Sequence, residues 1–231
     1  MELDEFYEKY YRHATESWIV KKNHSYSHRM LERGVKENFE NVIELGAGNG
    51  EHFQFVRHGF KTYLLSDLRE KTTFDSEDQR VRFESFNAEE IPYDENCFQR
   101  VISTCLLHHV TNVRGALEDM RRVATHEGLI SINIAADPGL MYRFIWSATS
   151  GRRLRNQGLK FPKSVHYQEH RGHFIGIREI ALEVFENDSI TLKYYPFTFI
   201  PTHQANIFAV MQVRVNKLSK IDGMGYDKET N

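Results

Sequence analysis

The sequence predicts an α/β protein built on a doubly wound sheet. Three observations predict it. From about residue 40 to residue 135, short apolar segments alternate with polar or amphipathic segments, as in repeated βα units. One apolar segment, Val42–Leu45, runs directly into three glycines at alternate positions. After residue 175, a segment with helical periodicity precedes two segments of alternating polarity, which we expect to close the sheet as a hairpin.

Composition limits the class of protein. The chain has 231 residues, 40% of them hydrophobic, which suffices for one α/β domain with a full core. The net charge of −2 gives no basic footprint for nucleic acid. Two cysteines, Cys97 and Cys105, make no disulfide framework and are expected to be reduced. The acidic N-terminus has no signal-peptide pattern, and no apolar run reaches the ~18 residues of a spanning helix. We therefore expect a cytoplasmic protein, and the oligomeric state stays open.

The glycine-rich stretch predicts a strand that turns tightly into a helix, with Phe53 and Val56 on the buried side of that helix. Glycine allows positive φ there and lets a ligand approach the main chain. Its spacing is acid-x-G-x-G-x-G. Glu51 stands where a dinucleotide fingerprint needs its third glycine, and no Gly-Lys-Ser/Thr of a P-loop is present. Glu44 and Glu51 would also repel a pyrophosphate. A nicotinamide-dependent oxidoreductase is therefore disfavoured.

The other expected elements follow from periodicity. Residues 3–18 form a helix with an aromatic stripe, and a second helix runs from Tyr26 to Phe39. The polar linker 71–80 is short for a complete crossover helix, and Gly128 turns the chain into the fifth strand. The remaining strands are expected at Thr62–Ser66, Val81–Phe86, Phe98–Thr104, Leu129–Ala135, Ile190–Tyr194 and Asn206–Val213, and helices at Asn112–Ala124 and Ile177–Phe185.

The run Glu44-Leu45-Gly46-Ala47-Gly48-Asn49-Gly50 resembles the first motif of the class I S-adenosylmethionine-dependent methyltransferases. Leu107-His108-His109-Val110 resembles the fourth motif of their small-molecule type, the methyltransferase type 11 or ubiquinone/menaquinone-methylase-like group. The resemblance covers about residues 40–135. It implies a Rossmann-like, seven-stranded, mostly parallel sheet with the last strand antiparallel, an N-terminal helical lid, and S-adenosylmethionine as cofactor with S-adenosylhomocysteine as product.

The domain boundaries that we expect are a helical cap over residues 1–39, a methyltransferase domain over 40–216 with a substrate-side insertion at about 138–175, and a flexible tail over 217–231.

Cofactor contacts are expected where the strands end. Asp67 lies 21 residues after Gly46 at a strand end, where the matching acid of the family accepts bonds from the ribose hydroxyls. As an alternative, Asp67 caps the residues after it. The family usually has Asp-Ala where Asn87-Ala88 stands, and the Asn87 carbonyl can still accept from the adenine amine. The expected cofactor-binding residues are Glu44, Gly46, Ala47, Gly48, Gly50, Asp67, Leu68, Asn87, Ala88, Glu89 and Thr104.

Methyl transfer from a sulfonium is an in-line displacement, so the enzyme mainly aligns the reactants and, where needed, removes a proton. Histidine is the usual base near neutral pH. The candidates are His109 and His108, as a base, as substrate-orienting groups or as a structural pair, and then His170. His166, His170 and His173 also suggest a metal site. Gly172 interrupts a regular helix there, and we expect no metal.

The acceptor is expected to be a small molecule with an O or N nucleophile, less readily a C nucleophile. Candidate substrate residues are Tyr11, Tyr26, Tyr142, Tyr167 and Arg171. The basic run Arg152, Arg153, Arg155 and Lys160, beside Tyr142, Phe144 and Trp146, is a solvated face, a site for an anionic group, or a lipid-contacting surface. These features favour a sugar-linked, phosphorylated or lipid-like acceptor, with peripheral lipid contact. The Asn/Asp-Pro-Pro-Phe/Tyr signature of nucleic-acid methylation is absent after the fourth strand.

A second hypothesis is a non-catalytic methyltransferase-like subunit. Asn87 and Gln99 stand where the family usually has acids, and this departure suggests it. The intact acid-and-glycine motif with Asp67 argues against it.

Overall fold

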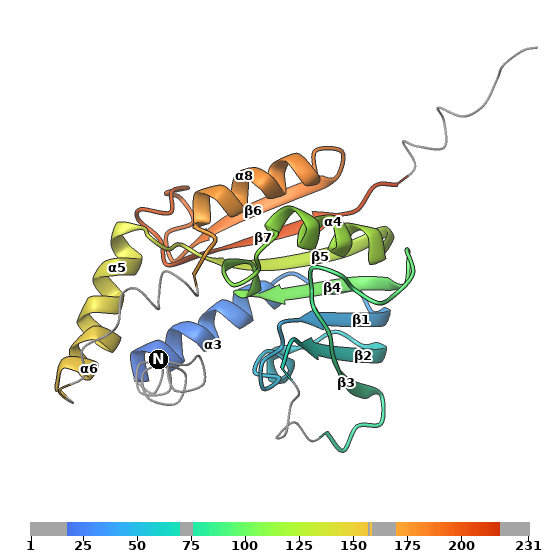
Figure 1. The fold of residues 1–231 in the computed structure, drawn as a ribbon, viewed down its shortest axis with the longest axis horizontal. Helices are drawn as coiled ribbons and strands as arrows, with labels where there is room; N and C mark the ends of the chain where they lie inside the picture. The colour runs from blue at the N-terminus through green and yellow to red at the C-terminus, as the bar shows by residue number, and fades with distance from the viewer. Residues whose placement is uncertain (1–17, 70–75, 157, 159–169, 218–231) are drawn as a thin grey trace, which may run out of the picture.

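The computed structural model describes residues 18–69, 76–156, 158 and 170–217 (Figure 1). The strands form one seven-stranded sheet in the order β3-β2-β1-β4-β5-β7-β6. The pairs β1/β2, β1/β4, β2/β3 and β4/β5 are parallel, and β7 is antiparallel to both β5 and β6. Six strands thus run one way and β7 the other, which confirms the predicted doubly wound sheet with its last strand antiparallel.

The elements have the following bounds: α3 Trp18–Glu32, β1 Phe39–Leu45, η2 Phe53–Phe55, β2 Phe60–Asp67, β3 Val81–Ser85, β4 Phe98–Thr104, η3 Leu106–His108, α4 Val113–Val123, β5 Ala124–Ala135, α5 Leu140–Trp146, η4 Ser147–Gly151, α6 Arg152–Asn156, α8 Phe174–Val184, β6 Ser189–Tyr195 and β7 Phe208–Arg214.

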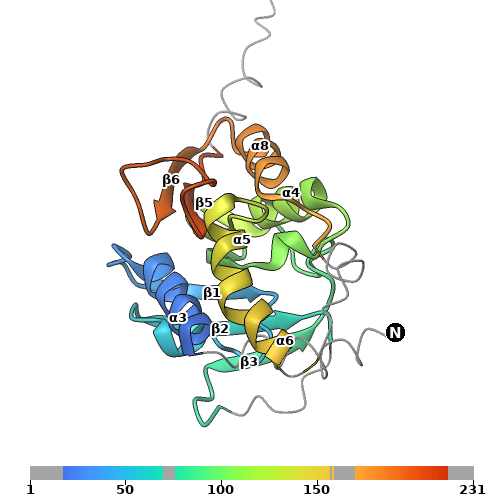
Figure 2. The same ribbon diagram turned by 90° about the vertical axis from the view of Figure 1, so that its left-hand side faces the viewer.

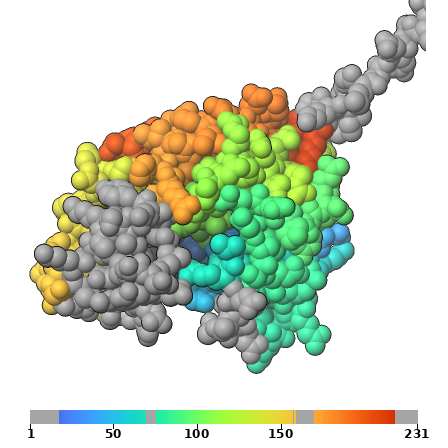
Figure 3. Space-filling model, in the orientation of Figure 1, coloured from blue at the N-terminus to red at the C-terminus, as the bar shows by residue number. Residues whose placement is uncertain are grey.

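Helices cover both faces of the sheet, so its central strands are apolar on both sides. On one face, Leu117 and Met120 of α4 and Phe174 of α8 pack with Ile43 and other strand residues. These two helices form the upper part of the surface seen from the front in Figures 1 and 3. On the other face, Leu31 of α3 packs against a second set of strand residues. The two layers hold the strand ends in fixed positions.

The helix before β1 differs from the expected one. It was expected at Tyr26–Phe39 but spans Trp18–Glu32. Gly34 takes a φ of +91°, which ends the helical path, and Phe39 is already the buried first residue of β1. The N-terminal helix expected over residues 3–18 lies almost wholly outside the described residues.

The full helix expected after the glycine turn is also absent. Only the 3₁₀ turn η2 forms, and the chain is extended again at Val56. Nine residues separate Gly50 from the start of β2 at Phe60, and a crossover between parallel strands usually needs a dozen or more. Phe53 instead packs edge-on against Tyr63 of β2, with ring centroids 5.0 Å apart.

The turn expected at Gly128 is an irregularity inside a strand. β5 starts at Ala124, directly after α4, and Glu127 takes a φ of +58°. The register between β4 and β5 shifts at this point, between Phe98 and Arg100. The strand therefore continues through Gly128 to Ala135.

Three consecutive helical pieces, α5, η4 and α6, form most of the described part of the expected insertion. They lie at one end of the molecule beside α3 (Figures 1 and 2). The start of α5 is fixed because Leu140 N–H donates to Gln204 Oε1 at 3.0 Å and Met141 N–H donates to the Gln204 carbonyl, also at 3.0 Å. The π-helical turn η4 in the middle is a rare feature that recurs at functional sites.

Candidate cofactor site and active site

The parallel strands end together at the edge of the sheet where the candidate residues lie. Leu45 is paired with Ser66 of β2 and with Ser103 of β4. Gly46, Asp67 and Thr104, each one residue further along, therefore follow these strands at the same level. The strand order reverses between β1 and β4, and open α/β sheets bind ligands at such a switch point.

The turn after β1 requires glycine. Gly46, Gly48 and Gly50 have φ values of +67°, +54° and +69°. A Cβ on Gly46 would lie 2.8 Å from Leu106 Cδ1, in the segment after β4. The turn is held to β2 because Ala47 N–H donates to the Ser66 carbonyl at 2.8 Å. The result is a rigid, close-packed turn at the switch point.

Asp67 joins the end of β2 to this turn. Its Oδ2 accepts from Gly48 N–H at 3.0 Å, and its Oδ1 accepts from Arg69 N–H at 3.1 Å. The second bond is the capping role given above as the alternative. Each carboxylate oxygen accepts more than one bond, so both retain capacity for hydroxyl donors. Asp67 therefore has the position and the acceptors that a ribose would need.

Glu44 lies inside the protein. Its side chain is fully buried, and Oε2 accepts from the Tyr63 hydroxyl at 2.7 Å. Burial raises the pKa of this carboxyl. Oε1 has no hydrogen-bond partner in the described part of the chain. The residue supports the end of β1 from within, and a cofactor contact by Glu44 stays a prediction.

In the segment after β3, the side chains of Asn87 and Glu89 already form hydrogen bonds within the protein. Asn87 Oδ1 accepts from Glu89 N–H at 3.0 Å, and Ala88 is buried. The carboxylate of Glu89 accepts from the backbone N–H groups of Thr111 at 2.6 Å and Asn112 at 3.1 Å. Glu89 thus fixes the two residues that precede α4, which favours a structural role for it. Leu68, after β2, has 72% of its surface exposed.

The histidines after β4 meet a histidine from far along the chain. His108 is buried, and its Nδ1 lies 2.7 Å from the Gly172 carbonyl oxygen. Because a carbonyl oxygen can only accept, Nδ1 carries the proton and donates it. Its Nε2 has no hydrogen-bond partner among the described residues. Burial lowers the pKa of His108 to about 4, so the ring is neutral at pH 7. Its ring stacks on that of His170, with centroids 5.3 Å apart.

His170 forms a pair with Asp137, which follows β5. His170 Nδ1 lies 3.1 Å from Asp137 Oδ2. The ring of the exposed His109 meets His170 edge-on, with centroids 5.0 Å apart. A carboxylate that accepts from Nδ1–H fixes the tautomer of the ring, with the proton on Nδ1. The three predicted histidines therefore lie together, and Asp137 is a functional candidate that the sequence analysis missed.

Comparison with known proteins agrees with this geometry. Residues 43–132 match the family model of a methyltransferase domain. This part of the chain is therefore similar to a methyltransferase domain. The structure of a putative S-adenosylmethionine-dependent methyltransferase from Listeria monocytogenes has the same fold, with a TM-score of 0.58 at 14% identity, over 84% of this chain and 99% of that one.

Two curated proteins are similar in sequence to part of the chain. The putative methyltransferase YrhH of Bacillus subtilis is 28% identical over 121 residues, which are 48% of this chain and 67% of YrhH. The human mitochondrial arginine-hydroxylase NDUFAF5 is 26% identical over 98 residues, which are 41% of this chain. The matched part spans only 28% of the human protein.

The candidate substrate residues are only partly brought together among the described residues. Tyr26 packs edge-on against Tyr195 and Phe208, with ring centroids 6.0 and 5.7 Å away, which favours a structural role. Arg171 donates to the Thr111 hydroxyl at 2.7 Å, near the start of α4. Tyr142 is half-buried on α5. Tyr11 and Tyr167 lie outside the described residues, as do His166 and Lys160.

A buried ionic network behind the glycine turn was not predicted. Arg100 of β4 is fully buried, and its Nη2 and Nη1 donate to the two oxygens of Glu32 on α3, at 2.6 and 3.2 Å. His52, just after the turn, contacts the same carboxylate through Nε2 at 3.0 Å. The network joins α3, the turn and β4. The only sequence signal was a lone arginine inside an apolar strand.

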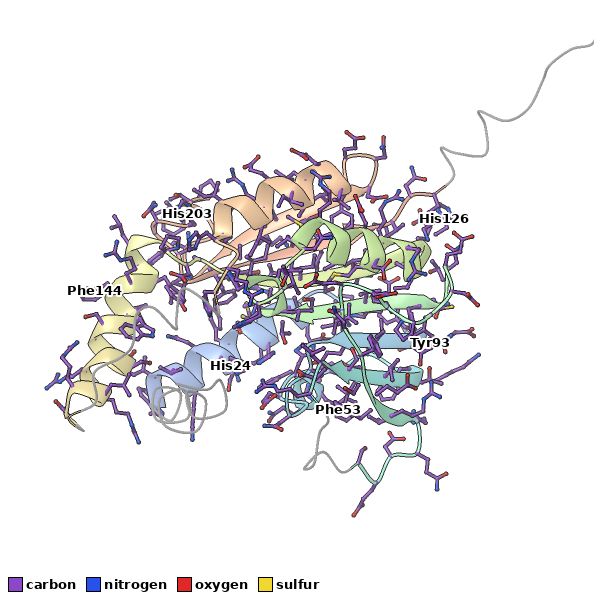
Figure 4. The ribbon with its side chains drawn as sticks, in the orientation of Figure 1. His24, Phe53, Tyr93, His126, Phe144 and His203 are labelled. Carbon is purple, nitrogen blue, oxygen red and sulfur yellow. The ribbon has the colours of Figure 1, made fainter. Side chains whose placement is uncertain are left out.

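Two further histidines of α3 extend this network toward the surface. His28 Nδ1 lies 3.0 Å from His52 Nδ1, and His28 Nε2 lies 3.1 Å from His24 Nδ1. Burial lowers the pKa of His28 to about 2, so it is neutral. Because the Glu32 carboxylate can only accept, His52 Nε2 carries the proton of this contact and donates it to Glu32. The row fixes α3 against the glycine turn (Figure 4 labels His24).

Within residues 18–69, 76–156 and 170–217, no three His, Cys, Asp or Glu side chains are grouped so that they could hold a metal ion. No helix of that part of the chain is long and apolar enough to cross a membrane.

Proposed function

We propose that the chain moves a methyl group from S-adenosylmethionine to an O or N nucleophile, less readily a C nucleophile, of a small molecule. The observation that carries this proposal is the contact between the glycine turn and the segment that bears the histidines. Gly46 packs on Leu106, and two and three residues later His108 and His109 contact His170. A cofactor-type turn and a candidate base thus share one edge of the sheet.

Named residues support binding of the cofactor. The carboxylate of Asp67 would accept from the ribose hydroxyls, and the amide of Asn87 with the Ala88 N–H would meet the adenine. The main chain of Gly46, Ala47, Gly48 and Gly50 permits close approach, since their turn has no side chain larger than a methyl group at these positions. When bound, the cofactor supplies a methyl group on a sulfonium, an excellent leaving group. The protein then has to align the acceptor and take up its proton.

His170 is the histidine that the geometry supports best as that base. Asp137 holds its Nδ1–H, and its Nε2 can take a proton from an acceptor hydroxyl or amine. His108, with its pKa lowered to about 4, is too weak a base at pH 7 and orients His170 by stacking. His109 contacts His170 at the surface and would face the acceptor.

The non-catalytic alternative loses part of its support. Gln99, one of the two departures from the family pattern, accepts from Asn41 N–H at 2.8 Å and so joins β1 to β4 where these strands begin. That end of the sheet lies away from the candidate site. The relative that is named a hydroxylase shows that likeness to this domain does not itself specify methyl transfer. The reaction therefore has to be measured directly.

We expect the full chain to transfer labelled methyl groups from S-adenosylmethionine to a member of a panel of sugar-linked, phosphorylated and lipid-like acceptors. Replacing His170 by glutamine will lower kcat by about 10²–10⁴-fold without changing cofactor affinity, because it removes the base alone. Asp137→Asn will lower kcat less, and Asp137→Glu will restore part of it, since Asp137 acts through His170.

His173→Gln is the matched control, because His173 is the N-cap residue of α8, three residues after His170, and among the described residues its side chain makes no hydrogen bond to Asp137. Transfer that is unaffected by His170→Gln contradicts the assignment of the base. A folded, cofactor-binding chain that labels no acceptor supports the non-catalytic alternative.

A further inference from the structure

Large hydrophobic side chains are exposed at one end of the molecule. This end is formed by the first turn of α3, by α5 and by the loop between β6 and β7, which lie at the left of Figure 1 and face the viewer in Figure 2. In Figure 4 the labelled Phe144 lies at its outer edge. The exposed fractions reach 71% for Trp18, 69% for Phe144 and 78% for Phe199. We call this set the apolar end: Trp18, Ile19, Leu140, Phe144, Phe197, Phe199 and Ile200.

The loop between β6 and β7 is built to hold its side chains outward. Fully buried Asn206 donates through Nδ2 to the carbonyls of Ile200 and Thr202, at 2.7 and 2.9 Å, and its Oδ1 accepts from Phe197 N–H at 2.8 Å. Gln204 of the same loop binds the start of α5. The loop and α5 therefore present one continuous surface. Exposed apolar patches of this kind on a folded protein mark a site of contact with a membrane, another protein or a ligand.

The described residues of this end carry a positive charge, although the whole chain carries a net charge of −2. The segment Leu140–Asn156 contains four arginines and no acidic residue, and residues 189–217 contain no acidic residue. Arg143, Arg152 and Arg155 are exposed beside the apolar side chains. Lys22 lies over the ring of Trp18, with Nζ 5.0 Å from the ring centroid. Aromatic and aliphatic side chains beside arginine and lysine are the composition of an interfacial lipid-binding surface.

We propose that the apolar end docks on the surface of an anionic lipid bilayer. Phe144 and Phe199 would enter the headgroup region, and Arg143 and Arg152 would meet lipid phosphates. A second copy of the chain is a poorer occupant, because a symmetric contact would set these arginines against one another. The candidate site lies at the same end of the sheet, where β5 ends and α5 follows. If the proposed function holds, docking brings that site to a lipid-soluble acceptor.

The test is co-sedimentation of the full chain with vesicles. We expect binding to vesicles of phosphatidylcholine that contain phosphatidylglycerol, and about tenfold weaker binding to vesicles of phosphatidylcholine alone, with salt weakening the former. The double variant Phe144→Glu/Phe199→Glu will lose binding to both. Arg143→Gln/Arg152→Gln will lose the preference for the anionic vesicles. None of these residues belongs to the candidate catalytic site, so cofactor binding by the variants will report that they are folded.

Leu182→Glu is the matched control, since Leu182 is an exposed apolar residue of α8 away from the apolar end, and it will bind vesicles as the unchanged chain does. Equal sedimentation with both vesicles, or binding that survives Phe144→Glu/Phe199→Glu, overturns the proposal. So does a lack of vesicle binding together with a dimer that these substitutions dissociate. Loss of methyl transfer with vesicle binding intact would contradict the proposed function and leave this inference standing.

Discussion

Replacing Arg100 by alanine will lower the free energy of unfolding by about 3–5 kcal/mol. The substitution removes both hydrogen bonds that Arg100 of β4 donates to the Glu32 carboxylate. That carboxylate stays in the interior, because the Glu32 side chain has only 5% of its surface exposed. An unpaired buried charge loses its hydration without compensation, and His52 alone supplies a single bond to the carboxylate. The docking of α3 against β4 depends on this carboxylate. Chemical denaturation followed by circular dichroism measures the change.

Arg114→Ala is the matched control, because Arg114 also pairs with a glutamate, Glu183, but both side chains are largely exposed. We expect it to cost about 0–1 kcal/mol. The double variant Arg100→Met/Glu32→Leu will recover most of the loss, since no buried charge remains. A cost for Arg100→Ala no larger than that for Arg114→Ala would contradict a structural role for the buried pair.

Replacing Asp67 by alanine will weaken binding of S-adenosylmethionine by about 100-fold. Two ribose hydroxyls that donate to a carboxylate are each worth about 1.5–3 kcal/mol, and a factor of 100 needs about 2.7 kcal/mol. The fold loses only the bonds from the backbone of Gly48 and Arg69, at the edge of the sheet. Affinity will therefore fall far more than the free energy of unfolding does.

Asp78→Ala is the control for this experiment. Asp78 accepts from the N–H of Arg80 two residues on, as Asp67 does from Arg69, but it lies in the segment before β3, at the other end of the strands. It will leave affinity unchanged. Equal losses of affinity and stability in Asp67→Ala would assign Asp67 the capping role alone.

The strands could be predicted because their signals are local. Phe98–Thr104 is predicted and observed with the same bounds, since an apolar run in a central strand is buried on both faces. The helix α3 was misplaced for a physical reason. Its buried residues are Ser27, His28, Leu31 and Glu32, mostly polar, so hydrophobic periodicity could not detect its inner face.

The candidate site could be predicted only as separate parts. The glycine turn is one continuous motif, and its positive φ values follow from its residues. Asp137 and His170 are 33 residues apart, and Glu32 and Arg100 are 68 apart, so no local pattern pairs them. An acid directly after the fifth strand was visible in the sequence, and the rule that ligands bind where parallel strands end would have selected Asp137.

The most direct test of the central claim is a calorimetric titration of the purified chain with S-adenosylmethionine, S-adenosylhomocysteine and NAD. We predict micromolar binding of the first two and none of NAD. The turn at Gly46–Gly50 has the glycine spacing expected for S-adenosylmethionine, and its acidic neighbours would repel the pyrophosphate of NAD. Binding of NAD alone, or of none of the three, would contradict the assignment of this turn as the cofactor site.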